Sequence, residues 1–150
     1  MPYYSLYLLV LHIRLSSTTY SSQLVDIFSY ELPLISLKHK HPSLLVVYNF
    51  HNLLTHSRYL LFTLNFNQLK NNFFLKSIAD LFPSAGWLER EVSELYGISF
   101  ENKKDTRNLM LQYGDVSTPF QKHFPTIGLK EFYYDTISDL IIQTQLTTQI

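Results

Sequence analysis

The sequence contains no cysteine. Within these 150 residues this excludes disulfide bonds, thiolate-ligated zinc, iron–sulfur clusters and a cysteine nucleophile. An excess of one charge is also missing, because twelve basic residues balance twelve acidic ones, and no net field attracts nucleic acid or anionic lipid. Only four glycines are present, and no G-x-G-x-x-G, P-loop, H-E-x-x-H or G-x-S-x-G pattern occurs. The common signatures of nucleotide binding, zinc proteolysis and serine hydrolysis are therefore absent.

Long apolar runs are missing too, although 46% of the residues are hydrophobic. A membrane-spanning helix needs roughly 20 apolar residues, whereas the longest run covers residues 3–11 and is followed by His12 and Arg14. Apolar and polar residues alternate from 9 to 15, which predicts a strand over residues 3–15. The start of the chain has neither the basic region and cleavage site of a secretory signal nor an Arg-rich transit pattern. We therefore expect no membrane span and no targeting segment.

Residues 21–42 predict two short elements and a turn. Ser21 and Ser22 precede apolar residues at helical spacing, which predicts a short helix that ends at Pro33. A brief strand over residues 34–37 and a polar turn over residues 38–42 are expected to follow.

Two apolar runs, at residues 43–50 and 59–66, predict an antiparallel hairpin joined by a long loop. Along the second run successive side chains alternate between two faces. One face carries Leu60, Phe62, Leu64 and Phe66. The other carries Thr63 and Asn65 but also Tyr59 and Leu61, so we expect that this face is covered as well.

Two helices are predicted on either side of Pro83. Ser77, with Asp80 three residues later, has the pattern of a capped short helix. The second helix extends from about Ser84 to Tyr96, and Gly97 follows where helices commonly end in the left-handed conformation. Its core-facing residues recur at helical spacing: Leu88, Val92, Leu95 and Tyr96.

Residues 101–130 show no sustained periodicity, which is unusual in a compact domain unless the segment is functional or rests on another protein. Short strands over residues 130–135 and 140–144 are predicted beyond it. We therefore predict an α/β fold of the two-layer α+β kind, with a mostly antiparallel sheet and helices on one face. The compact α/β domain is expected over residues 1–100 and an extended C-terminal arm over residues 101–150.

Histidines and lysines offer weak candidate sites. His39 and His41 could hold a metal from one side of an extended segment, but no carboxylate or thiol lies near them in sequence, and a solvated turn is the better interpretation. His51 and His56 flank the predicted hairpin loop and are interpreted as loop residues. The segment 38–41 could contact RNA, but it is short and the net charge is zero.

Four charges occupy six positions between Glu89 and Glu94, in a chain that is only 16% charged. Glu91 or Glu94 could serve a small enzyme as an acid or base, which requires a carboxyl in a pocket that shifts its pKa. Spacing alone favours a solvated helix face instead. Arg90 and Glu94 are four residues apart and could form an ion pair.

The segment A-G-W-L-E-R-E-x-x-E-L-Y-G-I-x-F, residues 85–100, resembles the most characteristic block of the thirty-kilodalton subunit of respiratory complex I, the proton-pumping NADH:ubiquinone oxidoreductase. Further matches follow in the same order and spacing, and the hairpin upstream is also similar, so the resemblance covers roughly residues 44–135. The shared residues for which we expect interface or structural roles are Trp87, Glu89, Arg90, Glu91, Glu94, Gly97, Asp105, Arg107, Tyr113, Gly114, Pro119, Lys122, Phe124 and Pro125.

Two stretches depart from the family pattern. The family's G-H-P-D is Asn102-Lys103-Lys104-Asp105 here, so a turn glycine and a proline are replaced. Its R-K-D-F-P is Gln121-Lys122-His123-Phe124-Pro125, which lacks the arginine and the aspartate. The Glu89-Arg90-Glu91 centre of the motif is retained.

The resemblance implies a non-catalytic structural subunit of the matrix-side peripheral arm of complex I, at the mitochondrial inner membrane. It implies no cofactor, no nucleic acid partner and no membrane span. The implied partners are the large quinone-site subunit and the iron–sulfur subunits, with the arm over residues 101–150 packed on these neighbours. Residues with AT-rich codons far outnumber those with GC-rich codons, which favours the mitochondrially encoded form of the subunit.

Two hypotheses about contacts follow from the resemblance. Aromatic anchors are expected at Phe100, Tyr113, Phe120 and Phe124. Ion pairs of Glu89, Arg90 and Glu91 are expected to hold the helix to the arm or to the large subunit. The rival interpretations are a small enzyme and an organellar RNA- or ribosome-associated protein.

Overall fold

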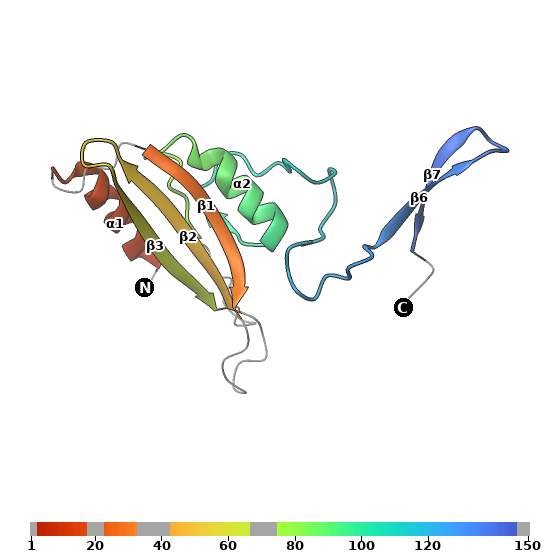
Figure 1. Ribbon diagram of the computed structural model, residues 1–150, viewed down its shortest axis with the longest axis horizontal. Helices are drawn as coiled ribbons and strands as arrows, with labels where there is room; N and C mark the ends of the chain where they lie inside the picture. Colours follow the sequence, from red (N-terminus) through yellow and green to blue (C-terminus); the bar gives the residue numbers. More distant parts are fainter. Residues whose placement is uncertain (1–2, 18–22, 33–42, 67–74, 147–150) are drawn as a thin grey trace, which may run out of the picture.

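The computed structural model describes residues 3–17, 23–32, 43–66 and 75–146 (Figure 1). Three antiparallel strands form one sheet in the order β1-β2-β3, and two short strands, β4 and β5, pair in parallel. The elements in chain order are α1 (Tyr3–Leu15), β1 (Gln23–Leu32), β2 (Ser43–Asn52), β3 (Ser57–Phe66), β4 (Leu75–Lys76), α2 (Ala85–Tyr96), β5 (Phe100–Glu101), β6 (Lys130–Asp135) and β7 (Leu140–Gln145).

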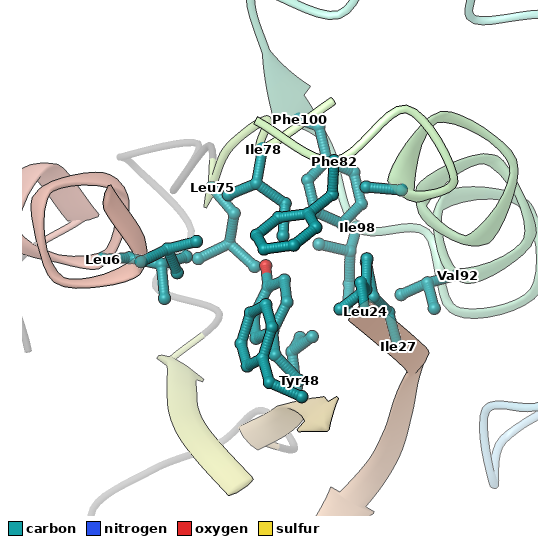
Figure 2. Packing of buried hydrophobic residues seen from close by; sticks show 14 of the residues in the cluster. Leu6, Leu24, Ile27, Tyr48, Leu75, Ile78, Phe82, Val92, Ile98 and Phe100 are labelled. Carbon is teal, nitrogen blue, oxygen red and sulfur yellow. The ribbon is translucent and has the colours of Figure 1, made fainter. Parts of the chain in front are cut away.

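Both helices cover the same face of the three-stranded sheet, and the core lies between the two layers (Figure 1). Residues of α1, α2, β1, β2 and the β4–β5 pair meet in one cluster, in which Tyr48 points upward from the sheet among Leu75, Ile78 and Ile98 (Figure 2). The predicted α/β class, with a mostly antiparallel sheet and helices on one face, is confirmed.

The predicted hairpin is confirmed, but its loop is shorter than expected. Strands β2 and β3 stay in register from Ser43 opposite Phe66 to Asn52 opposite Ser57, which leaves a turn of residues 53–56. The side chain of Asn52 accepts hydrogen bonds from the backbone N–H groups of Leu54 (2.9 Å) and Thr55 (3.3 Å). An Asn side chain can thus replace the backbone in closing a turn, so the strands continue farther than the apolar runs indicate.

Strand β3 turns its mixed face, and not its more apolar face, toward the core. Tyr59, Leu61 and Thr63 face the helices, so the expectation that this mixed face is covered is correct. The more apolar face is exposed to solvent. It carries Leu60, Phe62 and Leu64 of β3 and continues onto Phe28 and Tyr30 of β1, all of them 42–58% exposed. We call these five residues the outer sheet face.

Residues 3–15 form a helix, so the predicted strand is wrong. Leu6 and Val10, four residues apart, are both buried in the core, which is the spacing of one helix face. Alternation over only seven residues covers two helical turns and also fits a helix that is apolar on most sides. Among the described residues, no helix is long and apolar enough to cross a membrane.

Residues 23–32 form strand β1, so the predicted helix is also wrong. A bulge between Leu24 and Asp26 shifts the register against β2. Leu24 and Ile27 are therefore buried three residues apart, and only from Ile27 onward does strict alternation begin. A bulge inserts one residue into a strand, and here it imitates the spacing of a helix.

The short helix predicted at Ser77 is a single turn. The N–H groups of Leu81 and Phe82 both donate to the carbonyl of Ile78 (3.0 and 2.9 Å), and the turn ends there without becoming a helix of its own. Just before it, Leu75 and Ser77 donate to carbonyls of residues 99 and 101, which forms the β4–β5 pair. The strand predicted at 34–37, the turn at 38–42 and the histidines His39 and His41 lie outside the described residues.

The C-terminal segment has a different character. The two short strands predicted here are confirmed as β6 and β7. They pair as an antiparallel hairpin, with Lys130 opposite Gln145 and Asp135 opposite Leu140. The hairpin projects away from the sheet and helices at the end of an extended segment (Figure 1). No residue between 101 and 146 is buried.

Candidate functional site

Helix α2 ends where the sequence predicts. Gly97 has φ 72° and its N–H donates to the carbonyl of Ser93 (2.9 Å), which is the left-handed helix end expected of glycine. A side chain at this position would also come within 3.0 Å of the Cγ2 atom of Thr118. Gly97 therefore ends the helix and allows the C-terminal segment to pass close to it.

Glu89 lies on the core side of α2 and is completely buried, at 0% exposure. Its carboxylate accepts hydrogen bonds from the hydroxyl of Ser77 (2.7 Å) and the N–H of Ile78 (2.8 Å). Burial raises the pKa of Glu89, although these hydrogen bonds and the Lys103 ammonium act in the opposite direction. Glu89 thus fixes the turn after β4 against the helix.

Lys103 provides the charge opposite Glu89. Its Nζ lies 3.8 Å from Glu89 Oε2, and its side chain is only 5% exposed. Burial lowers the pKa of Lys103 to about 8, although Glu89 opposes this shift. Asn102 before it has φ 59°, a conformation that favours glycine and that Asn tolerates better than most residues. The departure from the family's G-H-P-D is therefore accommodated within this chain.

Arg90 points to the opposite side and holds the segment after β5. Its Nε donates to the carbonyl of Arg107 (2.8 Å), and its Nη2 donates to the carbonyl of Asn108 (3.1 Å). Its Nη1 is paired with Asp105 Oδ2 at 3.3 Å. Asp105 is paired with Arg107 as well (2.9 Å), and the side-chain and backbone hydrogen bonds from Arg107 lower the pKa of Asp105.

Glu94, one turn farther along α2, binds the same segment through its backbone. The carboxylate accepts from the N–H groups of Leu109 (2.7 Å) and Met110 (3.0 Å), and also from that of Leu111. Partial desolvation acts to raise the pKa of Glu94, but the three N–H groups outweigh it and the pKa is lowered. The ion pair predicted between Arg90 and Glu94 is replaced by contacts of both residues with residues 105–111.

The charged helix is therefore an anchor for the C-terminal segment. The hypothesis that Glu89, Arg90 and Glu91 hold the arm fits Arg90 and, through the ion pair with Lys103, also Glu89, although the hydrogen bonds of Glu89 lie inside the domain. Glu91 makes no hydrogen bond or ion pair with the described residues. The sequence did not predict that Glu94 accepts hydrogen bonds from the backbone of residues 109–111, nor that Ser77 and Lys103 are the partners of Glu89. Their separation from Glu89 in sequence left no local signal.

The arm continues along the domain for about another ten residues. Phe120 N–H donates to the carbonyl of Leu95 (3.2 Å), and its ring contacts Tyr96 edge-on at 5.5 Å between centroids. The Gln121 side chain donates to the carbonyl of Tyr96 (2.6 Å), and Lys122 N–H donates to Glu31 (2.7 Å) at the end of β1. Beyond Lys122 the described residues give no further hydrogen bond between the arm and the domain.

The other predicted residues take several positions. Trp87, Tyr113 and Pro125 are exposed, Pro119 and Phe124 are partly buried, and Gly114 has φ 83° in a turn. Phe100 is buried in the core of the domain, so the prediction that it anchors a partner is wrong.

Enzyme chemistry finds little support at these carboxylates. A general acid needs a pKa raised toward neutrality, whereas Glu94 is held in the charged form and its oxygens are occupied by backbone N–H groups. Within the described ranges, no group of three or more potential metal ligands comes together.

Comparison with known proteins identifies the family. The family described as "Respiratory-chain NADH dehydrogenase, 30 Kd subunit" matches residues 7–130. The chain belongs to this family. The match includes α2 and the arm segment that its charged residues hold.

Individual relatives match between 39% and 50% of the chain. NADH-ubiquinone oxidoreductase subunit 9 of Dictyostelium citrinum is 40% identical over 74 residues, which are 49% of this chain and 35% of that protein. NADH-ubiquinone oxidoreductase subunit 9 of Paramecium primaurelia is 45% identical over 60 residues, 40% of this chain and 29% of that protein. The iron-sulfur protein 3 of NADH dehydrogenase (ubiquinone) from Arabidopsis thaliana is 42% identical over 76 residues, 47% of this chain and 40% of that protein. The matched part thus spans well under half of the length of each of these relatives.

Proposed function

We propose that this chain is a non-catalytic structural subunit of the peripheral arm of proton-pumping NADH:ubiquinone oxidoreductase. The observation that carries the proposal is the use of the charged residues of α2. Arg90 and Glu94 are occupied in holding residues 105–111 of the same chain, and Glu89 is buried against Ser77 and Ile78. These groups build a scaffold, and none of them is free to react.

The arm supports a role in binding other subunits. No residue between 101 and 146 is buried as a whole, although this segment contains large apolar side chains. Four of them are more than half exposed: Tyr113, Phe132, Tyr134 and Ile141. An isolated two-stranded hairpin is marginally stable in water, and large apolar side chains are typical of interface centres. The arm is therefore suited to packing along the large quinone-site subunit and the iron–sulfur subunits, which supply the cofactors that this cysteine-free chain does not hold.

The outer sheet face supports the same conclusion from the other side of the domain. Its side chains are neighbours across the three strands. Phe28 and Phe62 flank Val47 of β2, Tyr30 and Leu64 flank Leu45, and Leu60 lies next to Phe62 on the same face. An apolar patch of this kind marks a protein contact surface. We place the subunit on the matrix side of the mitochondrial inner membrane, within the peripheral arm of the complex.

Native separation of solubilised mitochondrial membranes tests the proposal. Mass spectrometry across the gel should find this chain at the mass of the whole complex, in the bands with NADH dehydrogenase activity. Migration near its own 17.7 kDa, or with ribosomal particles, would overturn the proposal.

A matched pair of variants tests the role of the charged helix. Arg90→Ala should remove the chain from the high-mass band, because the arm is no longer held in its binding conformation. Glu91→Ala, at a partly buried neighbour without such contacts, should leave the band intact. Normal assembly of the Arg90→Ala variant would show that the anchor is not needed.

A further inference from the structure

A pocket of about 280 Å³ lies between the first turns of α2 and residues 102–107. Its rim carries Trp87, the only tryptophan of the chain, which is 61% exposed. The Arg90 guanidinium lies over the Trp87 ring, 5.2 Å from its centroid. Tryptophan and arginine are both enriched among the residues that contribute most of the binding energy in protein interfaces, and none of the contacts described above uses the outer side of this ring.

The side chains that line the pocket carry a positive excess. Arg90, Lys103, Lys104 and Arg107 face two acidic residues, Asp80 and Asp105. Asp105 is paired with both arginines, and the donors of Arg90 are used by Asp105 and two backbone carbonyls. The two lysines have only long ion pairs, both of 3.8 Å: Lys103 with Glu89, which is not among the lining residues, and Lys104 with Asp80.

Lys104 and Lys103 present their ammonium groups differently. The Lys104 side chain is 91% exposed, and its contact with Asp80 is long, at 3.8 Å, and also exposed. Such surface pairs are easily exchanged for others. The Nζ of Lys103 is buried and has no hydrogen-bond acceptor within the described residues, because Glu89 at 3.8 Å is beyond hydrogen-bonding distance.

A buried ammonium without an acceptor is unfavourable, and Lys103 borders the pocket. An oxygen atom that entered the pocket would supply the missing acceptor. A carboxylate would also neutralise the excess charge, and the ring of Trp87 offers an apolar wall for the methylene groups that carry it.

We propose that this pocket receives an Asp or Glu side chain of a neighbouring subunit, with Lys103 and Lys104 as its ion-pair partners and Trp87 as its cover. The inference rests on the proposed function, since it requires a neighbour within the complex. It identifies the chemistry of one contact, an acidic residue on the partner, that the exposed apolar surfaces do not reveal.

Zero-length cross-linking in the purified complex tests the pocket. A carbodiimide joins a lysine amine to a carboxylate only when the two are in contact. Mass spectrometry should find Lys104 joined to an Asp or Glu of another subunit. Lys104 joined only to Asp80, or left unlinked, would overturn the inference. Absence of the chain from the complex would instead contradict the proposed function.

Two substitutions at Lys104 give an independent readout. Because this side chain is almost fully exposed, its replacement leaves the fold intact. Lys104→Glu should lower retention of the chain in the complex at moderate salt by roughly three- to tenfold, because the reversed charge repels the partner carboxylate. Lys104→Arg should retain normal binding. Equal retention of the two variants would overturn the inference.

Discussion

The compact domain and the C-terminal arm are held in place by different kinds of interaction. In the domain, apolar side chains from two helices and two sheets bury one another, and the carboxylate of Glu89 is enclosed among them. In the arm, no residue from 101 to 146 is buried as a whole, although the side chain of Lys103 is enclosed against Glu89. The contacts of the arm with the domain are mostly hydrogen bonds between side chains of one part and backbone of the other. Burial stabilises the first region by itself, whereas the second has a defined path but little stability of its own.

Truncation of an aromatic ring in each region should separate the two most clearly. Phe82→Ala removes a buried ring whose centroid lies 5.4 Å from that of the Phe50 ring. It should destabilise the isolated chain by about 3–5 kcal/mol. Phe132→Ala removes an exposed ring of β6 and should change the stability by less than about 0.5 kcal/mol. Chemical denaturation of both variants measures this contrast, and similar losses would show that the hairpin is packed on the domain.

Glu89→Ala should give the next largest effect. The substitution leaves the Ile78 N–H and the Ser77 hydroxyl without their acceptor and the Lys103 ammonium without its opposite charge, which should destabilise the domain by about 3 kcal/mol. The control is Glu91→Ala on the same helix, for which no loss is expected. Thermal unfolding checks both, and a Glu89→Ala variant as stable as its control would contradict the role assigned to this cluster.

Arg90→Ala should act mainly on the arm. Loss of its contacts with Asp105 and the carbonyls of Arg107 and Asn108 should weaken the attachment of residues 105–111 by about 1.5–3 kcal/mol. Hydrogen exchange should rise in that segment while the amides of β2 stay protected. Faster exchange in β2 to the same extent would mean that the arm and the core unfold together.

Glu94 should make the arm attachment sensitive to acid. Its folded-state pKa is below the ordinary value of 4.5, so its contribution to stability is complete above that pH and is lost as the pH falls through the lowered pKa. Glu94→Gln should abolish this dependence and weaken the attachment by about 1 kcal/mol at neutral pH. Hydrogen exchange at residues 109–111 across a pH series measures both effects, with Glu91→Gln as the control that keeps the acid response.

The same contrast explains which features can be predicted from the sequence. Helix α2 and the β2–β3 hairpin have long, consistent local patterns, and the prediction of both is confirmed. Strand β1 has the sequence spacing of a helix because its bulge places buried residues three apart. Helix α1 has the alternation of a strand because it is apolar on several sides, and only its packing through Leu6 and Val10 reveals which residues share a face.

The sequence predicts the members of the site but not their arrangement. The family resemblance points to Glu89, Arg90 and Glu94, but spacing alone makes Glu94 a solvated residue. Its actual partners are three backbone N–H groups fifteen to seventeen positions away, which carry no residue-type signal at all. Lys103 stands out in the sequence only as a departure from the family pattern, because its pairing with Glu89 depends on the turn that Asn102 forms.

The outer sheet face also has a consequence for the supply of this protein in the cell. In a newly made chain that is not yet bound to a partner, the apolar side chains of this face are accessible to chaperones and proteases. Exposed surface of this kind promotes aggregation and invites degradation. We therefore expect surplus copies to be short-lived, so that the amount of this chain follows the amount of the partner that covers it.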